Sequence, residues 1–133
     1  MDRTSIRVEF KICSDNMDLS NVTKMMEINP TRSHLKGDPI ERMYLIRKDT
    51  LWTIETSYKE TYDLDDVLPQ VFNLISDKAD IIKSIKKMYD AEIIINIVVN
   101  IRDNEVPALY LHEDFLRFAG EIGARVGFPT YIF

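Results

Sequence analysis

Cysteine is nearly absent from this sequence, which has Cys13 as its single cysteine among 133 residues. An intramolecular disulfide is therefore excluded. Small secreted domains usually depend on several disulfides, so their absence favours a reducing compartment. The first residues also have no apolar core of the kind that a signal peptide needs. Together these features predict a cytoplasmic location.

Long hydrophobic runs are missing as well. The longest apolar stretch, Ile93 to Ile101, is interrupted by Asn96 and Asn100 and is far shorter than the roughly 20 residues that cross a bilayer. We therefore expect no membrane association. Lysine and arginine (17) are outnumbered by aspartate and glutamate (22), which gives a net charge of −5. Phosphate binding depends on clustered cations, so we also expect no nucleic-acid partner.

Residue types that ligate metals or hold phosphates are scarce. Histidine occurs only at His34 and His112, and no pair among these and Cys13 has zinc-finger or helix-face spacing. None of the four glycines belongs to a phosphate-binding loop. The acidic pairs at residues 65–66 and 113–114 lie at expected helix starts, where negative charge interacts favourably with the helix dipole. The sequence thus predicts no catalytic residue, no metal site and no cofactor.

The composition that remains is typical of one globular domain. Hydrophobic residues make up 45% of the chain and charged residues 29%, a balance found in folded domains. A chain of this length can bury a core without disulfides or metals. No linker divides it, so we expect a single α+β domain over residues 1–133.

Alternation of apolar and polar residues predicts the strands. Ile6, Val8, Phe10 and Ile12 alternate with polar side chains, which is typical of a strand with one buried face. Further strands are predicted at residues 43–47 and 51–58, joined as a hairpin by residues 48–50, and at residues 91–102, 108–111 and 126–133.

Apolar residues at helical spacing predict the helices. They cover residues 19–28, residues 63–89 with a break at 76–77, and residues 113–121. Asp18 is the expected N-cap of the first helix. Asp65 or Asp66 caps the second, because Pro69 is tolerated only near a helix start. Gly123 suits a left-handed residue just beyond the third.

The resulting order of elements is β-α-β-β-α-β-β-α-β. Its first six elements match the split βαββαβ plan of ferredoxin-like proteins, in which helices cover one face of a sheet. The predicted fold class is α+β. We expect a single mixed or antiparallel sheet with helices packed mainly on one face, made of a ferredoxin-like core followed by a C-terminal β-α-β unit.

Several landmarks occur in the order and spacing of a known family. They are Phe10 and Ile12 in the first strand, Ile28-Asn29-Pro30-Thr31, Lys36-Gly37-Asp38, Trp52 in a strand, Ile122-Gly123-Ala124 after the last helix, and Tyr131 near the end. In these the chain resembles the bacterial family known as domain of unknown function 4279. The resemblance implies a compact α+β domain, and members of such families are sometimes suspected of immunity or partner-binding roles. It transfers no catalytic residue.

The connection after the first predicted helix is the strongest candidate for a binding site. It is long for a helix-to-strand loop, and such loops often carry function. The candidate binding residues are Arg32, His34, Lys36 and Asp38 in this loop, with Trp52 as the floor of a pocket beneath it. Two of these residues also have a purely structural explanation. Asp38 could simply shape a turn by accepting backbone N–H bonds, and a tryptophan that points inward from a strand is more often part of the core.

Two functions fit these features. The favoured one is a non-enzymatic protein-interaction domain, for example an immunity-type protein that binds and blocks a protein partner. It would use the loop, or the uncharged edge from Val126 to Phe133, through which a homodimer could also form. The alternative is a small-molecule-binding domain or minimal enzyme, in which Arg32, His34 and Asp38 converge on a cavity beside Trp52.

Overall fold

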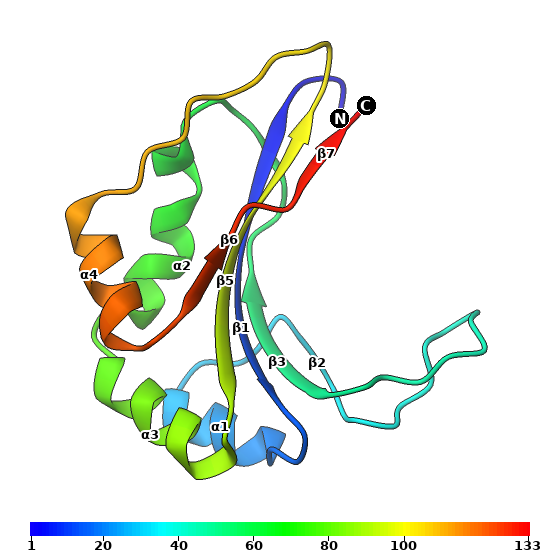
Figure 1. Cartoon of the computed structure of the whole chain (residues 1–133), viewed down its shortest axis with the longest axis vertical. Coiled ribbons are helices and arrows are strands. Elements are labelled where there is room, and N and C mark those ends of the chain that lie inside the picture. Colours follow the sequence, from blue (N-terminus) through cyan, green and yellow to red (C-terminus); the bar gives the residue numbers. More distant parts are fainter.

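The computed structural model describes residues 1–133 as one seven-stranded sheet with four α-helices. The strands are β1 (Ser5–Ser14), β2 (Arg32–His34), β3 (Thr50–Glu55), β4 (Lys59–Glu60), β5 (Glu92–Ile101), β6 (Arg125–Gly127) and β7 (Thr130–Ile132). The helices are α1 (Leu19–Met26), α2 (Leu68–Ile75), α3 (Ala79–Tyr89) and α4 (Glu113–Glu121). All four helices lie on one face of the sheet (Figure 1). The predicted α+β class and one-sided helix layer are confirmed.

The strand order explains why the core is ferredoxin-like. It runs β2-β3-β1-β5-β6, with β7 also paired to β5 and β4 to the start of β1. The pairs β1–β3, β2–β3 and β1–β5 are antiparallel, whereas β6 and β7 run parallel to β5. β1 and β2 are therefore parallel strands that flank β3, and α1 connects them. This is the split β-α-β arrangement.

Alternation along the central strands separates a helix-facing side from an open side. The apolar residues that face the helices are buried; they are Ile6, Val8, Phe10 and Ile12 of β1, and Ile93, Ile95, Ile97, Val99 and Ile101 of β5. Trp52 of β3 packs edge-on against Phe10, with ring centroids 6.5 Å apart. Burying apolar surface contributes roughly 25 cal/mol per Å², so this layer supplies most of the stabilisation.

Local chemistry sets the helix boundaries. The side chain of Asp18 accepts a hydrogen bond from the Asn21 N–H at 3.2 Å, which confirms it as the N-cap of α1. The predicted break in the middle region is present, since α2 and α3 are separate helices. Gly123 has a φ of 65° just beyond α4, and the Lys86 ammonium donates to its carbonyl at 2.9 Å.

The predicted cap at Asp65 or Asp66 is wrong by a few residues. The side chain of Asp63 accepts from the Asp65 N–H and starts a short 3-10 turn at Leu64–Asp66. Helix α2 begins only after that turn, without a side-chain cap and with Pro69 in its first turn. Two short elements therefore occupy a stretch where periodicity alone indicates one.

The predicted hairpin has a different first strand. β3 pairs with β2, which the sequence placed in a loop, while residues 43–47 make only an isolated bridge between Pro39 and Ile46. Residues 108–111 form no strand either. The reason is that β5 already pairs with β1 on one side and with β6 and β7 on the other, which leaves no ladder position for them.

The last predicted strand lies at a sheet edge, as Pro129 indicated, but it is two strands. β6 and β7 each contain three residues and flank Phe128 and Pro129. Proline has no N–H to donate to a ladder, so the pairing is interrupted at that point. No helix in the structure combines the length and the apolar character needed to cross a membrane.

Candidate functional site

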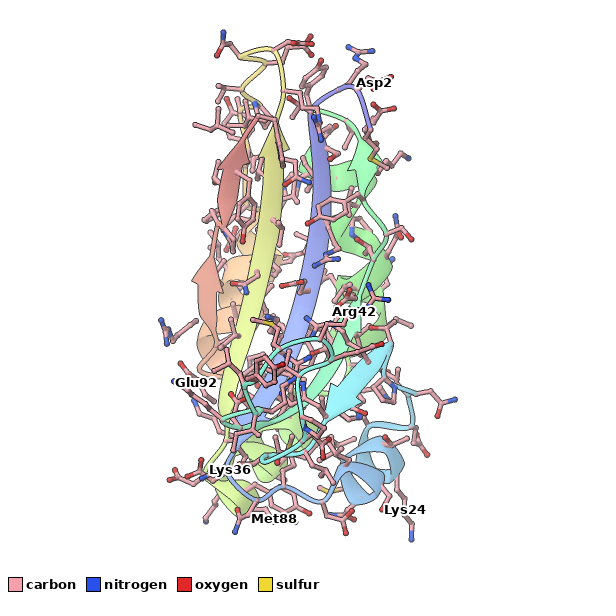
Figure 2. The ribbon with its side chains drawn as sticks, turned by 90° about the vertical axis from the view of Figure 1, so that its right-hand side faces the viewer. Asp2, Lys24, Lys36, Arg42, Met88 and Glu92 are labelled. Atoms are coloured by element: carbon pink, nitrogen blue, oxygen red, sulfur yellow. The ribbon has the colours of Figure 1, made fainter.

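The face of the sheet opposite the helices, termed the open face, carries polar and charged side chains along its central strands. Figure 2 looks onto this face, with β5, β1 and β3 side by side and no helix in front of them. The register places Glu9 of β1 opposite Glu55 of β3 and opposite Asn96 of β5. Lys11 is the next residue of β1 that points to the same face, and it lies opposite Thr53 of β3.

Five charged side chains meet on the open face and are termed the charge cluster: Arg7, Glu9, Lys11, Arg32 and Glu55. Two carboxylates directly opposite each other across a strand pair would repel. Arg7 bridges them, with one terminal nitrogen 2.6 Å from Glu9 and the other 3.3 Å from Glu55. Arg32 of β2 also bridges the two carboxylates. Its Nε is 2.5 Å from an oxygen of Glu55, and its Nη2 is 3.8 Å from an oxygen of Glu9. The Lys11 ammonium is 3.4 Å from Glu9.

Glu9 is the buried centre of the charge cluster, with only 4% of the residue exposed. Its burial alone would raise the carboxyl pKa, because it disfavours the charged form. The positive charges of Lys11 and Arg7 and the hydrogen bonds from Arg7 and Asn96 act in the opposite direction. The pKa of Glu9 is accordingly lowered below its usual value of 4.5, and the carboxylate is ionised at neutral pH.

Residues 35–49, termed the arm, form a two-stranded ribbon that projects from the open-face side of the sheet beyond β2 and β3 (Figure 1). Backbone hydrogen bonds join its two sides: the Gly37 N–H donates to the Arg47 carbonyl at 2.9 Å, and the Arg47 N–H donates to the Asp38 carbonyl at 2.8 Å. Two residues thus oppose one, as in a β-bulge, and Gly37 has the positive φ of 92° that such a position favours. The arm ends in a turn at Arg42, labelled in Figure 2, with a φ of 62°.

The tip of the arm exposes consecutive large apolar side chains to solvent. These are Met43, Tyr44, Leu45 and Ile46, and the side chain of Tyr44 is fully exposed. Single exposed apolar residues are ordinary, but contiguous ones at a projecting tip are typical of interaction surfaces. Four charged residues, Glu41, Arg42, Arg47 and Lys48, flank them. The arm is therefore an amphipathic projection.

A cavity of about 270 Å³ lies along the arm, and His34 of β2 is the one lining residue outside the arm. It is lined by His34, Ile40, Leu45, Ile46, Arg47, Lys48 and Asp49. The imidazole Nε2 of His34 is 3.5 Å from an Asp49 carboxylate oxygen, and that imidazole is mostly buried. The lining combines three apolar side chains with two cations, an aspartate and a histidine.

The structure brings together only part of the predicted loop site. Arg32 and His34 are on β2 and both face the open side, since they pair with Thr53 and Leu51. Lys36 instead reaches Asp15 at 3.5 Å. The side chain of Asp38 accepts from the Leu35 N–H at 2.8 Å, as expected of a turn-forming residue.

Trp52 does not form the floor of a pocket beneath this loop. Its side chain lies on the helix-facing side of β3, where the indole N–H donates to the Thr23 hydroxyl at 3.0 Å, and it is fully buried. Strand alternation puts Trp52 on the face opposite to Arg32 and His34. The arrangement in which Arg32, His34 and Asp38 converge beside Trp52 is therefore not formed.

Both histidines have acidic neighbours, which sequence spacing did not indicate. His112 lies just before α4, and its Nε2 is 2.8 Å from Asp65 beside the 3-10 turn. The hydrogen bond and charge of Asp65 raise the pKa of His112 above its usual value. This ion pair fastens the irregular segment before α4 to the turn before α2. No three His, Cys, Asp or Glu side chains are placed so that they could hold a metal ion.

The charged groups of the open face are paired with one another. Each carboxylate of the charge cluster contacts at least two cations, and no nucleophile lies beside a base in it. Cys13, further along β1, is a poor nucleophile, because burial and the charge of Asp49 raise its thiol pKa to about 11. An outward aromatic, Tyr58, stacks under Arg7 with the guanidinium carbon 4.7 Å from the ring centre.

Sequence reasoning named Arg32 and His34 as candidates but did not name Glu9, Arg7, Lys11 and Glu55. The charged residues of β1 fit a solvated strand face, and only the neighbouring strands β2, β3 and β5 turn that face into a buried cluster. The available signal was the alternation of sign, since Arg7, Glu9 and Lys11 occupy successive positions on one face.

The comparisons with known proteins identify a family. Residues 4–133 match the family model described as Domain of unknown function (DUF4279). No curated protein and no solved structure is significantly similar to the chain. The family match covers the landmarks from β1 to β7, including Trp52 and the segment around Gly37. The chain therefore belongs to the family Domain of unknown function (DUF4279).

Proposed function

We propose that this protein is a non-enzymatic protein-interaction domain that binds a protein partner through the arm and the adjoining open face. The observation that carries the proposal is the run of exposed apolar residues from Met43 to Ile46 at the tip of the arm. Exposing contiguous apolar surface is unfavourable in water, and binding a partner would remove it. An immunity-type role, in which the partner is blocked, is one form of this function.

The construction of the arm supports the proposal. Its hydrogen bonds are local: besides the bulge at Gly37, the Ile40 N–H donates to the Leu45 carbonyl at 2.9 Å. The ribbon is therefore stabilised by its own hydrogen bonds, and none of its residues belongs to the hydrophobic core. Pre-ordered contact residues also lose little conformational entropy on binding, which favours affinity.

The alternative function, a small-molecule-binding domain or minimal enzyme, has one feature in its favour. The cavity along the arm contains the His34–Asp49 contact. Its size is small for a pocket that buries a drug-sized ligand, and the other predicted polar groups point elsewhere. We therefore assign this cavity to a side chain of the protein partner, and we assign the protein to the cytoplasm, where a single reduced cysteine is typical.

Site-specific photo-crosslinking in the native host tests the proposal. A photoreactive amino acid at position 44, on the arm tip, should capture one defined protein in near-stoichiometric amount. The same group at Leu116, which is exposed on α4 away from the arm, is the control and should not capture that protein. The captured protein, once purified, should bind the unmodified chain. Equal capture from both positions, or no defined product from position 44, would contradict an interaction through the arm.

A further inference from the structure

The charges of this acidic chain are unevenly distributed over its surface. The open face and the arm together carry eight lysine and arginine side chains: Arg7, Lys11, Arg32, Lys36, Arg42, Arg47, Lys48 and Arg125. They carry seven acidic side chains: Glu9, Asp38, Glu41, Asp49, Glu55, Glu60 and Glu92. This surface therefore has a net charge of +1, and the remainder of the chain must have −6 to give the overall −5.

Arg32 is the most accessible cation of the charge cluster. Its side chain is 41% exposed, compared with 25% for Arg7 and 22% for Lys11. Its Nε is 2.5 Å from Glu55 and its Nη2 is 3.8 Å from Glu9, which fixes the guanidinium while Nη1 makes no ion pair. It lies on β2, an outermost strand of the sheet, at the base of the arm. An incoming carboxylate can therefore reach a guanidinium that is already positioned.

Two buried polar atoms on the open face have no partner within the chain. They are the Thr53 hydroxyl, in a fully buried residue opposite Arg32 and Lys11, and Nε of Arg7. A buried polar atom without a partner costs about 1–3 kcal/mol. Both atoms lie at the charge cluster, whose three cations outnumber its two carboxylates by one, so the cluster keeps one net positive charge.

We infer that the partner contributes an acidic segment with apolar side chains, whose carboxylates contact Arg32 and the arm cations Arg42 and Arg47 while its apolar side chains cover the arm tip. This inference rests on the proposed function and names the chemistry of the partner. Charge complementarity carries it, because this surface is positive in a negative chain. The apolar tip from Met43 to Ile46 has no counterpart on a phosphate backbone, so an acidic protein segment fits better than a nucleic acid.

Fluorescence anisotropy with defined peptides tests the inference on the full chain. The probe is a labelled twelve-residue peptide that alternates glutamate with leucine and tyrosine, and the comparison peptide has lysine in place of each glutamate. The glutamate peptide should bind saturably, and its affinity should fall at least tenfold between about 50 and about 500 mM NaCl, because salt screens exposed charges. The lysine peptide should not bind.

Charge reversal on the arm should weaken binding of the glutamate peptide at least tenfold. The double variant Arg42→Glu, Arg47→Glu changes two side chains that no ion pair engages, so it leaves the charge cluster intact. The matched control Lys24→Glu, Arg117→Glu makes the same change of net charge on the helix side and should bind as the unmodified chain does. Arg32→Gln, which removes a charge without adding one, should weaken binding as well.

Three outcomes would overturn the inference. These are no saturable binding of the glutamate peptide, equal binding of the glutamate and lysine peptides, or tighter binding of a single-stranded oligonucleotide than of either peptide. Failure of the proposed function is separate. If crosslinking at position 44 captures a partner whose binding is unchanged by Arg42→Glu, Arg47→Glu, the interaction domain stands and only its acidic chemistry is wrong.

Discussion

Glu9 is the residue on which the open face depends. It is a buried carboxylate between two cations of its own strand, and it also contacts Arg32 from β2 and Asn96 from β5. Buried charges are stable only when they are paired and hydrogen-bonded, and removing one member leaves the others uncompensated. The charge cluster is thus both a structural element and the base of the proposed binding surface.

We expect Glu9→Gln to lower the free energy of unfolding at pH 7 by about 1–3 kcal/mol, because buried cations then lose a charged acceptor. The folded-state pKa of Glu9 is lowered, so its contribution is present above the unfolded pKa and is lost as pH falls through the folded pKa. The difference between variant and unmodified chain should therefore shrink toward low pH. Urea unfolding at pH 7 and near pH 3 would measure it.

Glu41→Gln is the matched control for this change, since Glu41 is exposed on the arm and has no ion pair. It should leave the free energy of unfolding unchanged at both pH values. A loss from Glu9→Gln that is equally large at both pH values would show that shape, and not charge, explains the effect.

Cys13 is a second residue whose surroundings predict a measurable property. Burial and the charge of Asp49 raise its pKa from 9.0 to about 11. Only the thiolate reacts with iodoacetamide, so at pH 8 the folded chain should react about a hundredfold more slowly than the urea-unfolded chain. The rate in the folded state should keep rising with pH above 9.0. A plateau near that pH would contradict the raised pKa.

The arm carries the proposed contact residues but none of the core residues that stabilise the domain. It is joined to the sheet through β2 and β3, and the hydrogen bonds at Gly37 and Arg47 close it before its tip begins. Figure 2 shows the arm in front of the sheet, with Arg42 near its end. The core residues that stabilise the domain lie on the other side of the sheet.

Replacing residues 39–46 by Asn-Gly, a dipeptide that favours a tight hairpin turn, should shorten the arm without unfolding the domain. The melting temperature from circular dichroism should stay within about 5 °C of the original. Binding to the partner captured at position 44 should be lost. A variant that keeps both its melting temperature and its binding would show that the tip is not the contact surface.

Sequence patterns predicted those elements whose signal is local. The alternation of β1, the Asp18 cap, the break before α3 and the left-handed Gly123 were all predicted and are present. Residues 43–47 were wrongly predicted to be a strand of the sheet, because a run of apolar residues in the sequence does not distinguish a buried strand from an exposed ribbon. β2 was missed because three polar residues become a strand only through pairing with β3. The charge cluster depends on non-local register and could not be predicted in the same way.

At the scale of the whole molecule, the two edges of the sheet differ. β2 forms one edge and leads into the arm, while β6 and β7 form the other. This second edge exposes Phe128, Tyr131, Ile132 and Phe133, and the Arg102 guanidinium lies over the Phe133 ring at 4.2 Å. Exposed charges and proline are devices that keep sheet edges from associating. Here Pro129 interrupts the backbone ladder, and only side chains remain to make a contact.

We therefore expect two copies of the chain to associate weakly through this edge, with apolar side chains and not a continuous ladder holding them together. Light scattering should give a mass that rises from one chain of 15.6 kDa toward two as concentration increases. Ile132→Lys should keep the chain monomeric, because a lysine at the centre of a small apolar contact must be desolvated. Leu74→Lys, at an exposed apolar residue of α2, is the control and should not change the mass profile. A mass of one chain at every concentration would rule out association through this edge and leave the arm as the single interaction surface of the domain.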